Sequence, residues 1–374
     1  MNFDPHQLVA WGGFLLCVLA LLLFDLLVLH RDEHEIRMKE ALVGAAVPVA
    51  MAMAFAAVIL YAYQFHCCTL GTLTDRARDA IARDPNEAAY YPTDGFSACL
   101  LYVTGYLVEL SLSADNVFLF VILMRYFSVP AQLQHRVLFW GIIGALAMRA
   151  FMIVIGGALL LLFGWIIYIF GAIILITGIK MLFTGEEDKD PGNSIGVRIA
   201  RKLLPIHPAY EGNRFLVRKP AADGRIRTFA TTLFVVLVCI EVTDLIFALD
   251  SIPAIFGITK DTFIVFTSNV FAIIGLRSLY FLLAGVIDKF HLLKYGLAVV
   301  LAFVGFKMVL PLVGHLYAHF AGVEAEHWHV NKYLALGVIV VSLTASIVAS
   351  LVFPKPRGAG AARSRPGEAE AERD

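Results

Sequence analysis

Nine long apolar runs, separated by polar or turn-forming segments, dominate the pattern of this chain. Each run is long enough to cross about 30 Å of hydrocarbon, which takes about 20 helical residues. The pattern therefore predicts nine transmembrane helices, over residues 8–29, 41–65, 96–124, 137–160, 163–183, 229–255, 263–287, 293–317 and 332–353. An odd number of crossings places the two termini on opposite sides of the membrane.

The distribution of Lys and Arg predicts which side each terminus occupies. If the N-terminus lies outside, the inner segments carry 21 of the 30 basic residues and the outer segments carry five. Basic residues are retained on the cytoplasmic side during insertion. We therefore expect an N-out, C-in topology. No basic segment precedes the first run, so we expect that run to stay as a helix and not to be cleaved as a signal peptide.

Composition places the chain among integral membrane proteins. It is 59% hydrophobic and 16% charged, with a mean hydropathy of +0.77, which is too apolar for a soluble domain of this size. A formal net charge of zero predicts no nucleic-acid partner. The sequence has no ATP-binding or hydrolase motif, so we predict no enzymatic activity and no organic cofactor.

The five cysteines follow no metal-binding spacing, and most lie in or beside apolar runs, so we expect packing residues. The alternative is a disulfide between Cys99 and either Cys67 or Cys68, if that end of the protein faces an oxidising compartment.

The long polar segment 185–228 has three parts. An acidic start is followed by "IGVRIARKLLPI", which suits a short interfacial helix, and then by a hairpin expected around Asp223-Gly224. The alternative is a disordered basic linker. The tail 354–374 is rich in Pro, Gly, Ala and charge, has no apolar face, and is predicted to be disordered.

Four charged features recur in the same order in two parts of the chain: an acid, an aspartate six residues later, an arginine and a lysine. They are Glu109, Asp115, Arg149 and Lys180 in the first part, and Asp244, Asp250, Arg277 and Lys307 in the second. The arginine and the lysine are 31 residues apart in one copy and 30 in the other. This order predicts two three-helix repeats.

In the expected topology the two repeats are inverted, which is how many secondary transporters are built, with the substrate bound between the copies. The predicted divisions are two N-terminal helices with an outer loop (1–95), the first repeat (96–184), the cytoplasmic loop (185–228), the second, inverted repeat (229–318), the outer loop with the last helix (319–353) and the tail (354–374).

Helix geometry limits how the acids can meet. Glu109 and Asp115 lie six residues apart, which is about 120° around a regular helix, so they face one ion together only if the helix unwinds. Pro253 follows Asp250 by three residues and removes a backbone donor. We therefore expect an unwound turn with free carbonyls beside Asp250, as in other transporters.

Five acids inside apolar runs need compensation, because each costs about 2.5–3.5 kcal/mol at the bilayer centre, or roughly 15 kcal/mol together. A bound hard cation such as Mn²⁺, Mg²⁺ or Ca²⁺ would supply it, with Ser113 and Ser251 as further oxygen donors. Protonation is a second way to compensate the acids, and a proton-coupled exchanger would use it. Internal ion pairs are a third way. The predicted ligands are Glu109, Asp115, Asn116, Glu241, Asp244, Asp250 and Asn269.

The expected residues for charge pairing or proton coupling are Arg149, Arg277, Lys180, Lys307 and Asp25. Alternative interpretations remain for several residues. Asp25 can pair with Arg31 at the interface, the two asparagines can join helices, and the lysines can reach the membrane surface. A cluster at the last outer loop suggests an exit-side metal contact or pH sensor, with solvated side chains as the alternative: His315, His319, Glu324, Glu326, His327 and His329.

The chain closely resembles the TerC family of integral membrane proteins, and within it the Alx branch. The resemblance rests on long motifs that include "FDLLVLHRDEHEIRMKEA", "TGYLVELSLSADNVFLF", "FALDSIPAIFGITKDTFIVFTSNVFAIIGLRSLYFLLAGV" and "KYGLAVVLAFVGFKM". It implies nine helices, membership of the LysE-type transporter superfamily, a link to manganese efflux and metal homeostasis, and a need for the five membrane acids. The tail and the His/Glu-rich loop depart from the family pattern.

These observations together predict a multi-pass transporter of the bacterial inner membrane that exports Mn²⁺, its substrate, in exchange for protons. Carboxylates would repel an oxyanion, so transport of tellurite is not expected. One alternative is a non-transporting scaffold that assists metal loading or maturation of exported proteins. Another is a Ca²⁺/H⁺ exchanger. The sequence leaves open the stoichiometry, the selectivity among hard divalent ions and the oligomeric state.

Overall fold

A computed structural model describes most of the chain. The described residues are 5–24, 38–72, 75–83, 88, 90–163, 165–183, 195–203, 205–207, 209–220, 226–284, 292–321 and 330–353. Some side chains within these ranges are not described, among them those of Asp115, Asp250 and His315.

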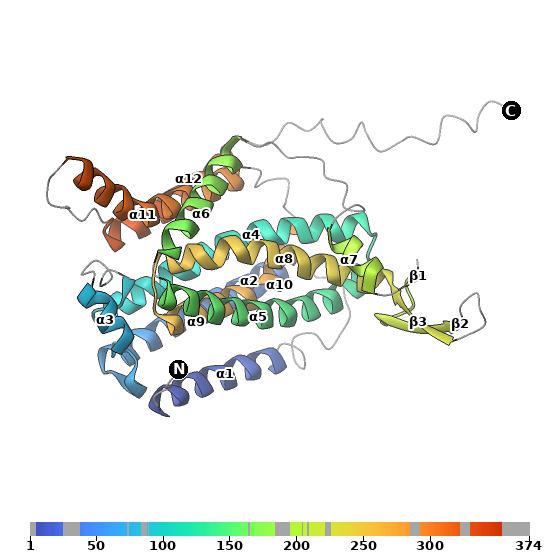
Figure 1. Ribbon diagram of the computed structural model, residues 1–374. Helices are drawn as coiled ribbons and strands as arrows, with labels where there is room; N and C mark the ends of the chain where they lie inside the picture. The colour runs from blue at the N-terminus through green and yellow to red at the C-terminus, as the bar shows by residue number, and fades with distance from the viewer. Residues whose placement is uncertain are drawn as a thin grey trace.

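The described part consists of twelve α-helices, one short 3₁₀ turn at Cys67–Thr69 and a small sheet (Figure 1). The helices are α1 (Pro5–Phe24), α2 (Met38–Gln64), α3 (Asp75–Arg83), α4 (Gly95–Tyr126), α5 (Ala131–Leu162), α6 (Ile166–Phe183), α7 (Ile195–Leu203), α8 (Thr232–Phe256), α9 (Thr262–Ile274), α10 (Leu276–Ala284), α11 (Leu293–Ala321) and α12 (Lys332–Val352). The strands are β1 (Ile206–His207), β2 (Leu216–Pro220) and β3 (Ile226–Thr231).

Eight stretches of the described chain are long and apolar enough to cross a membrane, with α9 and α10 together forming one of them. The prediction of an all-α polytopic membrane protein is therefore confirmed. The first predicted span corresponds to α1, whose apolar stretch Gln7–Leu23 is shorter, and the residues after Phe24 lie outside the described ranges. Nine crossings and the orientation in the membrane remain predictions.

The helices that carry the polar residues lie at the centre of the bundle. α4 packs against α2, α8, α9 and α10, and α5 packs against α8 and α9. Buried residues make up 59% of the apolar window of α4 and 67% of that of α9–α10, against 17% for α12. A polar residue on these helices therefore faces protein more than lipid, which is what makes a charge tolerable there.

A second group of helices, α6, α11 and α12, stands at an angle to this bundle (Figure 1). α6 and α11 touch backbone to backbone, because Gly178 lies against the backbone of Ala302 and Gly305 lies against that of Leu175. Small residues permit this close approach, which is the usual way in which membrane helices associate. Gly171 faces Met308 while Gly178 faces Ala302, so the two helices run antiparallel.

The polar segment between α6 and α8 is folded in its described part. α7 packs on α8, and the sheet has the order β1-β3-β2, with β1 parallel and β2 antiparallel to β3. The predicted short helix and hairpin are confirmed, with Pro220 opposite Ile226 beside the hairpin turn, whose residues 221–225 lie outside the described ranges. α7 and the sheet occupy one end of the molecule and α3 the other (Figure 1).

The prediction of an unwound turn at Pro253 is wrong. α8 continues through Asp250 and Pro253 to Phe256. Proline removes the hydrogen bond that its own N–H would donate, but α8 ends three residues later, and membrane helices tolerate proline where neighbouring groups satisfy the freed backbone. The interruption lies instead at Gly275, between α9 and α10, where the side chain of Pro48 on α2 packs against the break.

Candidate functional site

A buried arginine lies at the centre of the bundle. Arg149, on α5, exposes 1% of its surface and is the largest fully buried side chain in the described part of the chain. An isolated guanidinium in such a place would be very unfavourable, so the groups that contact it define the polar centre.

The partners of Arg149 come from three other helices. The guanidinium forms an ion pair with Glu109 on α4, and its Nη2 lies 3.3 Å from Oδ1 of Asp244 on α8. Its Nη1 donates a hydrogen bond of 2.8 Å to Oδ1 of Asn269 on α9. Four helices thus meet at one side chain, and each contributes one polar group.

The two acids outnumber the arginine. Glu109 and Asp244 each expose only 1% of their surface, and Arg149 is the one ion-pair partner that the described residues give to either of them. With both acids ionised, these three groups carry a net charge of −1. The centre therefore attracts a further cation, whether a proton or a metal ion.

Several buried polar atoms on these helices have no hydrogen-bond partner among the described residues. They are Oε2 of Glu109, Oγ of Ser113, Oδ2 of Asp244, Oγ of Ser251 and Nδ2 of Asn269. Asn116 contributes a long contact, with its Nδ2 3.5 Å from Oδ1 of Asp244. Buried polar atoms are rarely left without partners, so this group is a candidate for binding water or an ion.

A small cavity of about 10 Å³ adjoins Asp244. Its other lining residues are apolar and come from α4, α5, α8 and α10: Phe120, Leu138, Gly141, Ile142, Ala145, Ile240 and Leu276. A space of about 10–15 Å³ is enough for one water molecule. Asp244 is therefore the acid of the centre that a water molecule or an ion in this cavity would contact.

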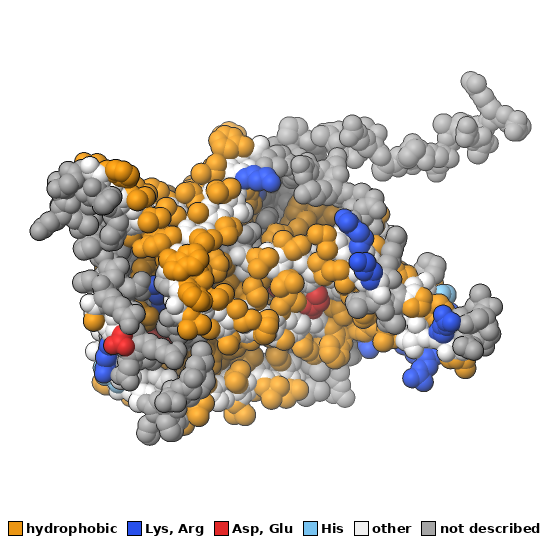
Figure 2. Space-filling view, in the orientation of Figure 1, with side chains coloured by type: hydrophobic (Ala, Val, Ile, Leu, Met, Phe, Trp, Pro, Cys, Tyr) orange, Lys and Arg blue, Asp and Glu red, His pale blue; other side chains and the backbone are white. Residues whose placement is uncertain are grey.

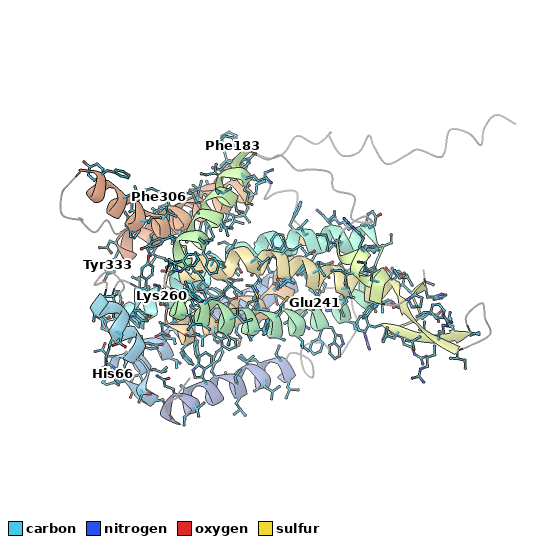
Figure 3. The ribbon with its side chains drawn as sticks, viewed as in Figure 1. His66, Phe183, Glu241, Lys260, Phe306 and Tyr333 are labelled. Carbon is cyan, nitrogen blue, oxygen red and sulfur yellow. The ribbon has the colours of Figure 1, made fainter. Side chains whose placement is uncertain are left out.

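Glu241 lies one helical turn before Asp244 on α8 and interacts electrostatically with it, while the ion pairs described for Arg149 are with Glu109 and Asp244. The carboxylate of Glu241 rests directly on Gly144 of α5, where any larger residue would occupy the same space. The side chain is half-buried, and Oε2 is buried without a hydrogen-bond partner among the described residues. Figure 3 labels Glu241 on the front of α8, and Figure 2 shows acidic atoms at that position within a largely apolar surface.

The structure gives the backbone but not the side chains of Asp115 and Asp250. α4 is a continuous helix, so positions 109 and 115 lie about 120° apart around it and do not share a face. Asp25 lies outside the described residues, as do Glu324, Glu326, His327 and His329 of the outer loop.

The remaining cations are distributed over the molecule. Lys307 donates a hydrogen bond of 3.1 Å to the carbonyl of Gly257, where its charge is favourable beside the end of α8. Lys180 is exposed near the end of α6, and Arg277 is 5% exposed at the start of α10. Among the described residues, Lys307 contacts Gly257 and Tyr90 and not the centre around Arg149.

No three His, Cys, Asp or Glu side chains in the described set lie close enough to hold a metal ion, and the side chains of Asp115 and Asp250 fall outside that set. Of the seven predicted ligands, the structure therefore brings four together around Arg149, places Glu241 one turn from Asp244 on α8, and leaves the side chains of two undescribed. The five cysteines are free thiols, so the alternative of a disulfide with Cys99 is not realised.

A second polar cluster, at the end of the bundle near α3, was not predicted. Two ammonium groups lie over the ring of Tyr90: Nζ of Lys260 is 5.0 Å and Nζ of Lys307 is 5.4 Å from the ring centroid, and Lys260 is labelled in Figure 3. The carbonyl of Tyr90 accepts a hydrogen bond of 2.9 Å from Oγ1 of Thr259. The partners are far apart in the sequence, and no motif marks Tyr90.

Several known proteins are similar to this chain in sequence over most of its length. An uncharacterised membrane protein of Myxococcus xanthus is 41% identical over 342 residues, which cover 91% of this chain and 92% of the relative. Alx of Escherichia coli K12, whose name proposes a membrane-bound redox modulator, is 40% identical over 330 residues, 88% of this chain and 90% of the relative.

A thylakoid membrane protein, TERC of Arabidopsis thaliana, is 38% identical over 258 residues, which cover 69% of this chain and 62% of the relative. No solved structure matches the chain. The sequence profile of the integral membrane protein TerC family matches residues 95–358, which include both clusters of membrane acids. The chain is therefore a multi-pass integral membrane protein that belongs to the TerC family.

Proposed function

We propose that the protein is a secondary transporter that exports a divalent metal cation, with Mn²⁺ as the expected substrate, in exchange for protons. The observation that carries the proposal is the buried centre around Arg149. There Glu109 and Asp244, which occupy corresponding positions in the two aligned parts of the chain, converge on one guanidinium with uncompensated negative charge. Acids in such positions within a membrane are costly and usually functional.

The donor atoms favour a hard cation. The groups available at the centre are carboxylate, amide and hydroxyl oxygens, which suit Mn²⁺, Mg²⁺ or Ca²⁺. Cys239, the thiol nearest to Glu241 along the chain, packs against Gly196 of α7. A thiolate ligand, which would favour a softer metal, is therefore not available from this position.

The packing of α6 on α11 supports an inverted repeat. Gly178 lies against Ala302 and Ala298, while Gly305 lies against Leu175 and Gly171. The three α6 residues in these contacts, 171, 175 and 178, become the three α11 residues, 298, 302 and 305, when 127 is added to each number. The same offset relates Lys180 to Lys307. Reciprocal contacts between corresponding residues of antiparallel helices are what a twofold axis between inverted copies produces.

The packing of the other helices agrees with the same axis. α5 packs against α8, and α9 packs against α4, so the second helix of each copy lies against the first helix of the other. Glu109 and Asp244, as corresponding residues, then approach each other near the axis, where transporters of this architecture bind their substrate.

The proposed direction rests on the distribution of charge. Figure 2 shows basic side chains over α7 and the sheet, at the end of the molecule that the predicted topology places in the cytoplasm. The cavity beside Asp244 lies on the α8 segment that follows this end along the chain. A cytoplasmic cation would therefore reach Asp244, and protonation of the acids from the other side would release it.

The test is manganese flux in proteoliposomes that contain the purified protein. An imposed pH gradient is expected to drive Mn²⁺ transport in the wild type and not in Asp244→Asn or Asp250→Asn. Glu211→Gln, in the exposed segment between β1 and β2, serves as the matched acid-to-amide control and should transport normally. Wild-type protein without Mn²⁺ flux would contradict the proposal and favour a non-transporting scaffold.

Two further measurements refine the assignment. Competition by Ca²⁺ for the same flux would point to a Ca²⁺/H⁺ exchanger if Ca²⁺ is carried more efficiently than Mn²⁺. Manganese content of cells with and without the protein, at neutral and alkaline pH, tests the direction of transport. Cells that contain Asp115→Asn should accumulate as much manganese as cells without the protein.

A further inference from the structure

We propose that Arg149 is a tethered cation that occupies the transport centre whenever the substrate is absent. In this scheme the guanidinium holds Glu109 and Asp244 in the empty carrier, and the divalent cation binds only after Arg149 has left at least one of them. The inference rests on the proposed function and adds to it how the metal-free centre becomes neutral enough to return: the guanidinium balances one acid, and the exchanged proton balances the other.

The burial of the acids creates the need for such a cation. Glu109 and Asp244 are each 1% exposed, and each receives an ion pair from Arg149 alone among the described residues. Without a counter-charge, two ionised carboxylates in a membrane would resist any movement that takes them past lipid or apolar side chains. Arg149 supplies that counter-charge from within the chain.

The contacts of Arg149 suit a side chain that an incoming cation can displace from Asp244. Its bond to Asp244 is long for a charged pair, at 3.3 Å, and it uses only Oδ1, which also receives the contact from Asn116. Oδ2 of Asp244 and Oε2 of Glu109 accept no hydrogen bond within the described part of the chain. Each acid therefore keeps a free oxygen for an incoming ion while the arginine still holds the other.

The cavity indicates where the exchange begins. Asp244 lines it, whereas Glu109 and Arg149 do not. An ion that arrives through the cavity thus meets Asp244 before it meets the arginine, and the repulsion between the two cations weakens the 3.3 Å contact. Asn269 accepts a 2.8 Å hydrogen bond from Nη1 of Arg149. This bond keeps the displaced guanidinium on the α9 side of the centre.

The experiment separates net transport from exchange in proteoliposomes. Net transport requires the metal-free carrier to return with its proton, whereas exchange of external for internal Mn²⁺ requires only the metal-loaded carrier. The wild type should perform both. Arg149→Gln, which leaves the acids without their tethered cation, should retain exchange and lose net transport. Its apparent affinity for Mn²⁺, measured by calorimetry in detergent, should rise about tenfold because the competitor is gone.

The controls keep folding and function apart. Arg136→Gln removes an exposed arginine from the cytoplasmic end of the same helix, where it stacks on Phe215, and should leave both activities intact. Arg149→Lys retains one charge but has a single nitrogen in place of Nη1 and Nη2, which reach Glu109 and Asp244 separately, so net transport should fall more than exchange. This variant also serves as the test if Arg149→Gln does not fold.

The outcomes are distinguishable. If a folded Arg149→Gln protein loses exchange and net transport together, or keeps both, the tethered-cation proposal is wrong while the transporter assignment stands. An Arg149→Gln protein with unchanged or weaker Mn²⁺ affinity also overturns it. If the wild type performs neither reaction and binds no Mn²⁺, the proposed function fails, and the inference fails with it.

Discussion

At the residue scale, the stability of the centre depends unequally on its members. Arg149 compensates two acids, whereas Glu109 and Asp244 each compensate part of one arginine. Removal of the arginine therefore leaves two buried carboxylates without a positively charged partner. Removal of one acid leaves one ion pair intact, and the net charge of the centre then changes from −1 to zero.

This difference predicts an order of stabilities for two variants. Arg149→Met should lower the free energy of unfolding by about 3–5 kcal/mol, as expected when a buried charge loses its partner. Glu109→Gln should lower it by only about 1–3 kcal/mol, because Asp244 still pairs with the arginine. Unfolding in detergent, followed by circular dichroism, measures both, and equal losses would contradict the unequal roles.

The membership of this centre was only partly predictable. The shared spacing of the two acidic stretches predicted that Glu109 and Asp244 correspond, and the structure brings them to the same arginine. The sequence did not identify which of the two arginines would bridge them. That choice depends on the rotation of α5 against α4 and α8, which is set by packing around residues such as Gly144 and not by any local pattern.

At the element scale, long apolar runs predicted the helices well and their breaks poorly. α4 extends over Gly95–Tyr126, against a predicted 96–124, because the apolar run itself defines the span. α5 begins at Ala131 rather than 137, since its first turns, "AQLQHR", are polar and project beyond the apolar run. Pro253 was expected to break a helix and does not, whereas Gly275 does.

The glycines between α6 and α11 predict a second pair of variants. Gly178→Val should destabilise the protein by about 1–3 kcal/mol or more, because its side chain would meet the backbone of Ala302, which cannot move aside as a flexible side chain can. Gly337→Val on α12 is the control, since nothing lies within 4 Å of a side chain there. Thermal unfolding of both variants in the same detergent tests the prediction, which fails if they are equally stable.

The folded loop between α7 and α8 predicts a pH dependence outside the membrane. Lys219 hydrogen bonds to Glu211 and lowers the pKa of that carboxyl below its ordinary value of 4.5, with His207 adding to the effect. A carboxyl with a lowered pKa stabilises the fold fully above its unfolded pKa, and the contribution is lost as pH falls through the folded pKa.

Because Glu211 is exposed, the effect on overall stability should be small, and the local fold is the better readout. Proteolysis of the loop should accelerate as the pH falls below the ordinary pKa of 4.5, with a protease that is active at acidic pH. In Lys219→Met the same proteolysis should be faster at neutral pH and depend less on pH. If acidification affects the wild type and Lys219→Met equally, the ion pair does not hold the loop.

At the scale of the whole molecule, one end carries α7 and the sheet, with basic side chains over them (Figures 1 and 2). The opposite end carries α3 and the cluster of Tyr90 with Lys260, which Figure 3 labels. The two ends are therefore chemically different, although the contacts between α6 and α11 are reciprocal. Inverted copies make the two openings of a carrier alike in backbone, so the loops must set the direction of transport. The orientation in the membrane is then the property on which the proposed export depends.

Labelling of single cysteines tests that orientation. In a protein whose five native cysteines are replaced, Asn213→Cys would place an exposed thiol between β1 and β2, and Thr93→Cys would place one before α4, at the other end. Intact cells treated with a membrane-impermeant maleimide should label position 93 and not 213, and inside-out vesicles should give the reverse. The expectation follows from retention of the basic loop in the cytoplasm. The reverse result would make the cavity beside Asp244 open outward, and the same centre would then serve uptake of the cation and not its export.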